Sequence, residues 1–193
     1  MLPLVFFRYL WKLISEFKAI EKYRSAASKI SAMVQVRNAE ILNIALLKGE
    51  STHSATKGRT KANKATLEAS GKTIHYVYED YADWSTETAA KMFHQFLQTG
   101  QPVDAVICNN DSMAVGVAQE VQKAKIDTNT LPILGVDATT DGLDLISQGA
   151  MACTIFQPAK GQGEAAVKAA EKLASGQSVE SLDGAEHNGL FVW

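Results

Sequence analysis

Cysteine is scarce in this chain, with only two residues, Cys108 and Cys153, in a sequence of 193. Each falls in or at the end of a different predicted strand, and the strand order expected for this fold places a third strand between them. Their Cα atoms would then lie much further apart than the ~7 Å that a disulfide allows. We therefore interpret both as small buried apolar residues, which excludes a disulfide framework and indicates no particular redox compartment.

An excess of charge of either sign is absent as well. Nineteen Lys and Arg residues stand against 21 Asp and Glu, for a formal net charge of −2. This balance leaves no electrostatic footprint for nucleic acid, so we expect no nucleic-acid partner. One local basic cluster, Lys57, Arg59, Lys61 and Lys64, is interpreted from composition alone as a solvated helix face.

Long apolar runs are missing too. The first 14 residues are apolar, but Arg8 and Lys12 interrupt them, and a membrane-spanning helix needs ~20 apolar residues. A secretory signal carries its positive charge before the apolar core, whereas here charged residues follow it, so we expect no signal peptide in this chain. Apolar residues at three- and four-residue steps between 10 and 34 predict an amphipathic helix, so residues 1–40 are expected to form an N-terminal helical segment.

Catalytic motifs are also lacking. The sequence contains no GxxxxGK, GxGxxG or GxSxG pattern, and no Cys/His spacing suited to zinc. Asp104 and Asp111 flank one predicted strand from opposite ends, so they cannot act as a carboxylate pair. Asp137 could imitate the phosphorylated residue of a receiver domain, but the usual acidic pair after the first strand is replaced by Glu50 alone. We expect a protein that is not an enzyme and that needs no cofactor or metal, with a flavodoxin-like enzyme as a distant alternative.

Short apolar runs that alternate with helical patterns are what the chain does contain. Such runs, rich in β-branched residues, are typical of buried parallel strands. Their alternation with helices predicts an α/β fold with a doubly wound, parallel, five-stranded sheet of order 2-1-3-4-5. The strands are expected at 40–47, 73–78, 104–108, 132–136 and 151–156, and the helices at 55–69, 86–98, 111–125, 140–148 and 159–174.

Polar or aromatic residues follow each predicted strand. In an open parallel sheet, a ligand lies beyond the carboxyl ends of the strands, so these residues are expected at one edge. They combine a cation, several planar amide or carboxylate groups and a large aromatic ring, which suits a neutral polyol because each hydroxyl both donates and accepts. The set comprises His53, Arg59, Asp80, Asp83, Trp84, Asn109, Asn110, Asp111, Asp137 and Gln157.

Several of these residues have a plainer interpretation. Asp111 is expected as the N-cap of its helix rather than as a ligand contact. Asn110 is interpreted as a contact, with a place in the same cap as the alternative, and Asp137 as a contact, with a loop carboxylate or an N-cap as the alternative. Trp84 could be a stacking platform or a core filler. On composition alone, the other three have ordinary explanations: a solvated helix residue for Arg59, a loop histidine for His53 and a linker residue for Gln157.

Four segments together resemble a known family, the periplasmic sugar-binding proteins of ABC transporters, and within it most closely the galactose- and glucose-binding members. The resemblance covers about residues 41–176. An Asn-Asn-Asp run followed at this spacing by Gly-Val-Asp is specific, although neither half would be alone. The segments are Leu46-Leu-Lys-Gly-Glu50 with His53 and Arg59, Asp83-Trp84, Val106-Ile-Cys-Asn-Asn-Asp-Ser-Met-Ala-Val-Gly116, and Pro132-Ile-Leu-Gly-Val-Asp137 through Gly149-Ala150.

The resemblance implies a fold of two α/β lobes joined by a three-stranded hinge, with a monosaccharide such as galactose or glucose in the cleft. It implies that residues 41–158 form one sugar-binding lobe, and that the 159–193 helix and tail pack on the other lobe and the hinge. It further implies a periplasmic location and the membrane subunits of an ABC transporter as partners. The implied ligand residues are Arg59, Asn110 and Asp137 for hydroxyls, Trp84 for stacking, and His53 and Gln157 as further contacts.

Three departures from the family qualify this expectation. Ala55 stands where the family carries an acidic ligand, and residues 35–40 are too poor in carboxylates for the calcium loop of the galactose-binding members, so no metal site is expected. The first lobe has no counterpart here, so we expect a truncated, incomplete receptor. The alternative is a ligand-sensing module of a sugar-responsive regulator or a chemoreceptor partner, with a homodimer formed through the 159–174 helix.

Overall fold

The computed structural model describes residues 40–179, 187–188 and 191–192, so the predicted N-terminal helix falls outside the described residues. The chain divides into two compact units, Met1–Phe156 and Gln157–Trp193. The division falls two residues before the boundary expected from the sequence.

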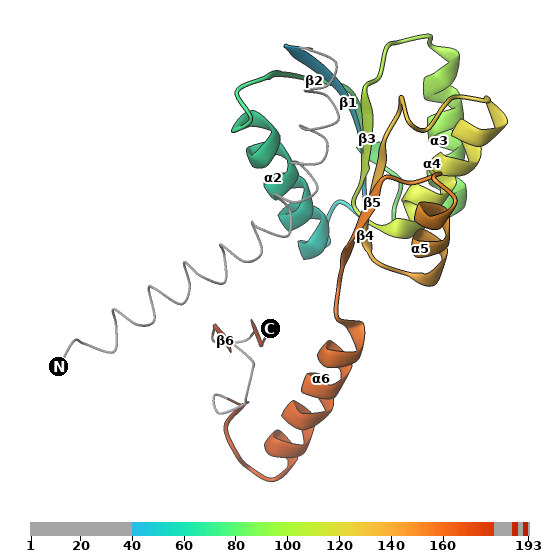
Figure 1. The fold of residues 1–193 in the computed structure, drawn as a ribbon. Coiled ribbons are helices and arrows are strands. Elements are labelled where there is room, and N and C mark those ends of the chain that lie inside the picture. Colours follow the sequence, from blue (N-terminus) through green and yellow to red (C-terminus); the bar gives the residue numbers. More distant parts are fainter. Residues whose placement is uncertain (1–39, 180–186, 189–190, 193) are drawn as a thin grey trace. The chain divides into compact units, whose positions relative to one another are not determined.

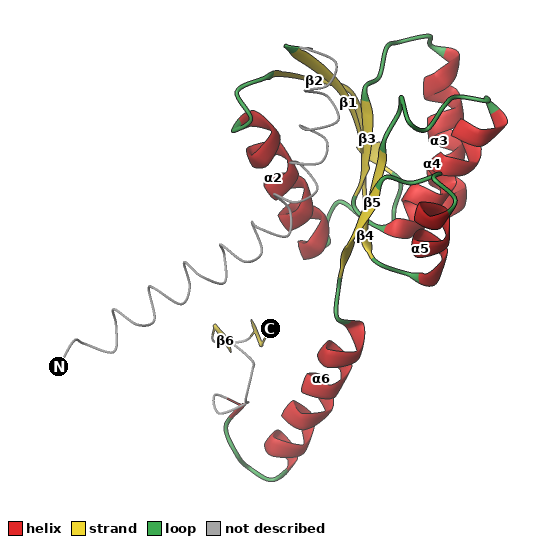
Figure 2. Cartoon of the chain, in the orientation of Figure 1, coloured by secondary structure: helices red, strands yellow, loops and turns green. Residues whose placement is uncertain are grey.

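The first unit is built on one parallel sheet of order β2-β1-β3-β4-β5, which confirms the predicted fold class. Figure 2 shows these strands between helices, with loops joining each strand to the helix that follows it. The strands are β1 (Ile41–Lys48), β2 (Thr73–Tyr81), β3 (Ala105–Cys108), β4 (Ile133–Asp137) and β5 (Cys153–Phe156). The helices are α2 (Ser54–Glu68), α3 (Thr86–Gln98), α4 (Asp111–Lys123) and α5 (Thr140–Ser147).

Two apolar clusters, one on each face of the sheet, form the core of this unit. Because successive side chains of a strand point to opposite faces, β1 contributes Leu42, Ile44 and Leu46 to one cluster and Ala45 and Leu47 to the other. Helix α2 covers the first face, and α3, α4 and α5 cover the second (Figure 1). Both faces of the central strands are therefore buried, which explains their continuous apolar sequence.

The cysteines lie where the strand order predicted. Cys108 in β3 and Cys153 in β5 are both buried, β4 runs between them, and they are not joined in a disulfide. Burial raises the pKa of the Cys108 thiol, and the charge of Asp111 adds to this effect. Cys108 is therefore held as an uncharged, small core residue.

Two local predictions were wrong. The strand expected at 73–78 continues as β2 to Tyr81, because β1 runs on to Lys48 and the two strands stay paired to their ends. Asp111 was expected as the N-cap of α4, but Asn110 occupies that position, its side chain accepting from the Met113 amide. Asp111 is instead the first helical residue, and its side chain turns away from the helix end into the protein.

The second unit contains α6 (Ala159–Ala174), at the bounds that the sequence predicted, and a short antiparallel pair, β6 (His187–Asn188) with β7 (Phe191–Val192). None of the residues of α6 is buried, and Val167 and Leu173 are 59% and 61% exposed. Across the described ranges, no helix combines the length and the apolar character needed to cross a membrane.

Candidate ligand-binding site

Arg59 is the residue that joins the ends of two strands. It is only 7% exposed, its Nη1 donates to the backbone oxygen of Asn109 after β3 at 2.6 Å, and its Nη2 donates to Oδ1 of Asp137 at 3.0 Å. The composition-based interpretation of Arg59 as a solvated helix residue was therefore wrong. The buried face of α2 repeats at steps of three and four residues, and Arg59 falls on that face with its charge balanced by Asp137.

Asp137 ends β4 with a side chain that is 30% exposed. Its backbone has φ = 117°, a conformation that residues with a Cβ rarely adopt, and Ala138 follows with φ = 55°. Partial burial is the main cause that raises the pKa of Asp137, and the negative charge of Asp111 adds to it. The ion pair with Arg59 acts in the opposite direction without cancelling the rise.

Trp84 lies beside this pair. Its ring is 5.7 Å from the guanidinium carbon of Arg59 and meets the His53 ring edge-on, with the ring centroids 5.3 Å apart. The indole covers Gly49, whose missing side chain leaves room for the ring, and it also packs against the core cluster under α3 and α4. The half-buried position of Trp84 is compatible with both predicted roles, a stacking platform and a core filler.

His53 and Asn110 are both helix caps as well as candidate contacts. The exposed His53 accepts from the Ala55 amide through Nδ1 at 3.1 Å at the start of α2. Asn110 is 8% exposed and uses Oδ1 to accept from the Met113 amide at 3.0 Å. The cap fixes the Asn110 side chain and leaves its amide nitrogen, a donor group, for another partner.

Gln157 is not placed relative to the other candidates. It opens the second unit, where its Nε2 lies 3.4 Å from Oε1 of Gln162. Its expected role as a ligand contact therefore stays a prediction. Arg59, Asp137, Asn110, Trp84 and His53, by contrast, all belong to the first unit, and the contacts described above link Arg59 directly to Asp137 and Trp84.

Asn109 and Asp111 belong to the group expected at the sheet edge but not to the predicted ligand contacts. Asn109 is fully buried, and its Oδ1 accepts from the Gly49 amide at 3.3 Å and from the Thr60 hydroxyl at 3.2 Å. Its carbonyl oxygen accepts the hydrogen bond from Arg59, while its Nδ2 is a buried donor with no partner among the described residues. The Asn-Asn-Asp run was the available signal, but the sequence does not tell which of its three side chains turn inward.

Within the described part of the chain, no three His, Cys, Asp or Glu side chains come together to hold a metal ion. Asp104 instead accepts from the backbone and side-chain amides of Asn43, at 2.8 and 3.0 Å. This carboxylate ties the segment before β3 to β1, at the edge of the sheet opposite to Asp137.

The side chains at this edge combine hydrogen-bonding groups with a flat apolar surface. A buried guanidinium, a half-exposed carboxylate, a carboxamide and an indole can donate to hydroxyls, accept from them and cover a C–H face. The fold has known parallels among solute receptors. A solved structure of an ABC transporter solute binding protein from Bacillus halodurans with bound myo-inositol superposes with a TM-score of 0.70 at 30% identity, covering 77% of this chain and 50% of the other.

The chain belongs to the periplasmic binding protein domain family, which matches residues 19–178. It is 36% identical over 136 residues to the "Putative rhizopine-binding protein" of Rhizobium meliloti, covering 70% of this chain and 44% of the relative. It is 33% identical over 139 residues to the D-galactose/methyl-galactoside binding periplasmic protein of Haemophilus influenzae, covering 71% and 41%. These relatives are binding proteins and not enzymes, and the alignments span less than half of their length.

Proposed function

We propose that this chain is the sugar-binding lobe of an ABC transporter solute receptor, and that it takes a neutral monosaccharide or cyclitol at the carboxyl edge of its sheet. The observation that carries the proposal is the buried Arg59, held between the Asn109 carbonyl and the Asp137 carboxylate. The relatives support the class of ligand, because the name of one refers to galactose and that of a solved structure to myo-inositol.

The charge balance of the site favours an uncharged ligand. Arg59 and Asp137 form an ion pair, so together they bring no net charge that would select an anion or a cation. A hydroxyl can donate to the exposed part of the Asp137 carboxylate, and charge-assisted hydrogen bonds of this kind are the strong ones. Trp84 offers a rigid flat surface for the C–H face of a sugar ring.

One lobe supplies only part of a ligand shell. The alignments cover 41% and 44% of the relatives, and a two-lobed receptor excludes water from its ligand by closing its cleft. We therefore expect a dissociation constant in the millimolar range, which corresponds to about −4 kcal/mol. The place of action is proposed to be the periplasm, and the partners the membrane subunits of the transporter.

The test is a titration of the ¹⁵N-labelled chain with D-galactose, D-glucose, D-ribose and myo-inositol, followed by the shifts of the Trp84 indole and the Arg59 side chain. We expect saturable shifts with at least one of them. Asp137→Asn should weaken that binding at least about tenfold, because a hydrogen bond to a charged group contributes roughly 1.5–3 kcal/mol. Asp144→Asn is the matched control, because Asp144 is exposed on α5.

Two results would count against the proposal. The first is that none of these compounds moves a resonance at the strand ends. The second is that Asp137→Asn and Asp144→Asn bind alike. Differences among the four compounds would rank the specificity of the lobe, with galactose or glucose expected first from the residues that resemble the galactose-binding members.

A second candidate function is a ligand-sensing module that works as a homodimer. The observation in its favour is α6, which has no buried residue and exposes Val167 and Leu173. A helix with an apolar stripe needs a cover, and a second copy of the chain would supply one. The oligomeric state separates the two candidates.

A further inference from the structure

The turn that ends β4 has an unfavourable backbone. Asp137 and Ala138 both have positive φ, 117° and 55°, although each carries a Cβ. Such residues persist only where the surroundings hold them, and they concentrate at functional sites. Asp137 is also the carboxylate that Arg59 pairs with, so whatever holds this turn decides where the Asp137 carboxylate points.

Asp111 holds the turn through two threonines. Its Oδ2 accepts from the amide of Thr139 at 2.8 Å and from the hydroxyl of Thr139 at 3.2 Å. Its Oδ1 accepts from the hydroxyl of Thr154 in β5 at 2.6 Å, and the oxygen of that hydroxyl accepts from the amide of Ala138 at 3.1 Å. The two backbone amides that follow Asp137 are thus bound to Asp111, one directly and one through Thr154.

The surroundings leave the Asp111 carboxylate little freedom. Asp111 is fully buried, and a Cβ at Gly135 in β4 or at Gly142 in α5 would overlap its side chain. Both elements therefore approach the carboxylate closely only because glycine stands at these positions. A buried carboxylate with three well-placed donors is fixed in one orientation.

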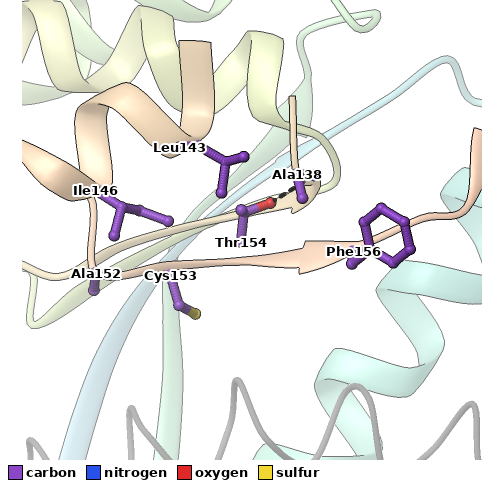
Figure 3. A pocket seen from close by; sticks show the side chains of 7 residues that line it. All are labelled: Ala138, Leu143, Ile146, Ala152, Cys153, Thr154 and Phe156. Carbon is purple, nitrogen blue, oxygen red and sulfur yellow. Dashed lines mark hydrogen bonds between the residues drawn. The ribbon is translucent and has the colours of Figure 1, made fainter. Parts of the chain in front are cut away.

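An apolar pocket of about 400 Å³ adjoins the turn. Its lining includes Leu143 and Ile146 of α5 and Phe156 of β5, and Thr154 supplies the only hydroxyl among the seven lining residues. Figure 3 shows this hydroxyl turned toward Ala138. At the border of this pocket, the Thr154 hydroxyl accepts from the Ala138 amide and donates to Asp111.

We infer that Asp111 is a positioning residue: with Thr139 and Thr154 it fixes the 137–139 turn so that Asp137 faces Arg59 and the ligand. The inference rests on the proposed function and adds to it a residue that does not touch the sugar. Asp111 directly follows Asn110, so the same helix start sets the positions of Asn110 and Asp137 relative to each other. Both carboxylate oxygens of Asp111 accept from donors of Thr139 and Thr154. Asparagine cannot replace Asp111, because its NH₂ group would put a donor in place of one of these two acceptors.

The test compares Thr154→Val with Thr154→Ser. Valine keeps the shape but removes the acceptor for the Ala138 amide and the donor to Asp111, whereas serine keeps both. Three quantities are measured: hydrogen-exchange protection of the Ala138 amide, the resonances of the Arg59 side chain without ligand, and the affinity for the sugar that binds best. Thr128→Val is the control, because the Thr128 hydroxyl donates to the Gly149 carbonyl, outside the network.

For Thr154→Val we expect faster exchange at Ala138, shifted Arg59 side-chain resonances and affinity lower by about tenfold, the loss of roughly one hydrogen bond. Thr154→Ser and Thr128→Val should behave as the unaltered chain. Unchanged Arg59 resonances, or affinity within about twofold of the unaltered chain despite loss of protection at Ala138, would overturn the inference. If Thr154→Val does not fold, Asp111→Asn is measured in the same way, with the same expectations.

Failure of the proposed function would be visible separately. If the unaltered chain binds no sugar, the proposed function fails, while the Arg59 resonances still report whether the network sets the Asp137–Arg59 pair. If the unaltered chain binds sugar and Thr154→Val binds it equally well, only the positioning role of Asp111 fails.

Discussion

At the residue scale, the backbone at Gly49 runs directly beneath the indole of Trp84. A Cβ at Gly49 would overlap the six-membered ring of Trp84, so glycine is needed here for close approach and not for its φ angle. Trp84 itself has φ = 63°, and its ring touches His53 and lies over Arg59. The position of the Trp84 ring, the candidate stacking surface, therefore depends on Gly49 having no side chain.

Gly49→Ala should push the Trp84 ring away and destabilise the fold by about 1–3 kcal/mol, the usual effect of overpacking. Gly58→Ala, in the middle of α2 with nothing within 4 Å of the added carbon, should stabilise by about 0.5–1 kcal/mol through helix propensity. Urea unfolding of both variants measures the two free energies, and the Trp84 indole resonance reports the ring. An unmoved indole in Gly49→Ala would show that the ring does not depend on this glycine.

At the element scale, one carboxylate joins α2, β1 and β2. Glu79 on β2 accepts from Lys48 of β1 at 3.0 Å and from Lys64 of α2 at 2.6 Å, and the Lys48 ammonium lies 3.9 Å from the centre of the Tyr81 ring. Partial burial raises the pKa of Glu79, but the hydrogen bonds and charges of Lys64 and Lys48 outweigh it, so the pKa lies below its ordinary value. The edge strand β2 is thereby fastened to its neighbours.

The sign of the pH dependence follows from this lowered pKa. The stability that Glu79 contributes is complete above its ordinary value of 4.5 and is lost as the pH falls through its lower value in the folded state. Glu79→Gln should therefore flatten the fall in unfolding free energy as the pH drops below about 5. Glu50→Gln, at an exposed carboxylate, is the control. Equal slopes in the two variants, measured by urea unfolding at each pH, would contradict this prediction.

At the scale of the whole molecule, the two units contribute differently to stability. Both core clusters belong to the first unit, whereas α6 in the second unit contains no buried residue. Hydrophobic burial is the dominant favourable term in folding, so the stability of the sheet should reside in residues up to Phe156. The exposed apolar residues of α6 are then available for an association that the first unit does not need.

A chain that ends at Phe156 should have a free energy of unfolding within about 1 kcal/mol of that of the full chain, since only surface groups are removed. A chain that ends at Gly149, without β5, should lose the partner of β4 together with the buried Met151 and Cys153, and should unfold. Circular dichroism during urea titration tests both. Sedimentation of the full and shortened chains then decides between the candidate functions, because a full-length dimer that becomes a monomer on shortening favours the sensing module. An unfolded chain ending at Phe156 would refute the prediction.

Local pattern was enough to predict the elements. Every helix and strand from β1 to α6 was expected within a few residues of its observed bounds, because apolar periodicity and turn residues are properties of neighbouring positions. The continuation of β2 to Tyr81 was missed, since it depends on pairing with Lys48 across the sheet. The direction of the Asp111 side chain was missed for the same kind of reason, because its partners Thr139 and Thr154 lie 28 and 43 residues away.

The sequence by itself determined the parallel sheet, its strand order and the group of polar residues beyond the strand ends, because right-handed crossovers leave few topologies for alternating strands and helices. Only the tertiary structure decided which of those residues act together. It buried Arg59 on the inner face of α2, where Asp137 offsets its charge, and it turned Asp111 inward to hold the strained turn. A buried charge is stable only beside its partner, and the partners are distant in sequence, so the fold had to bring them together.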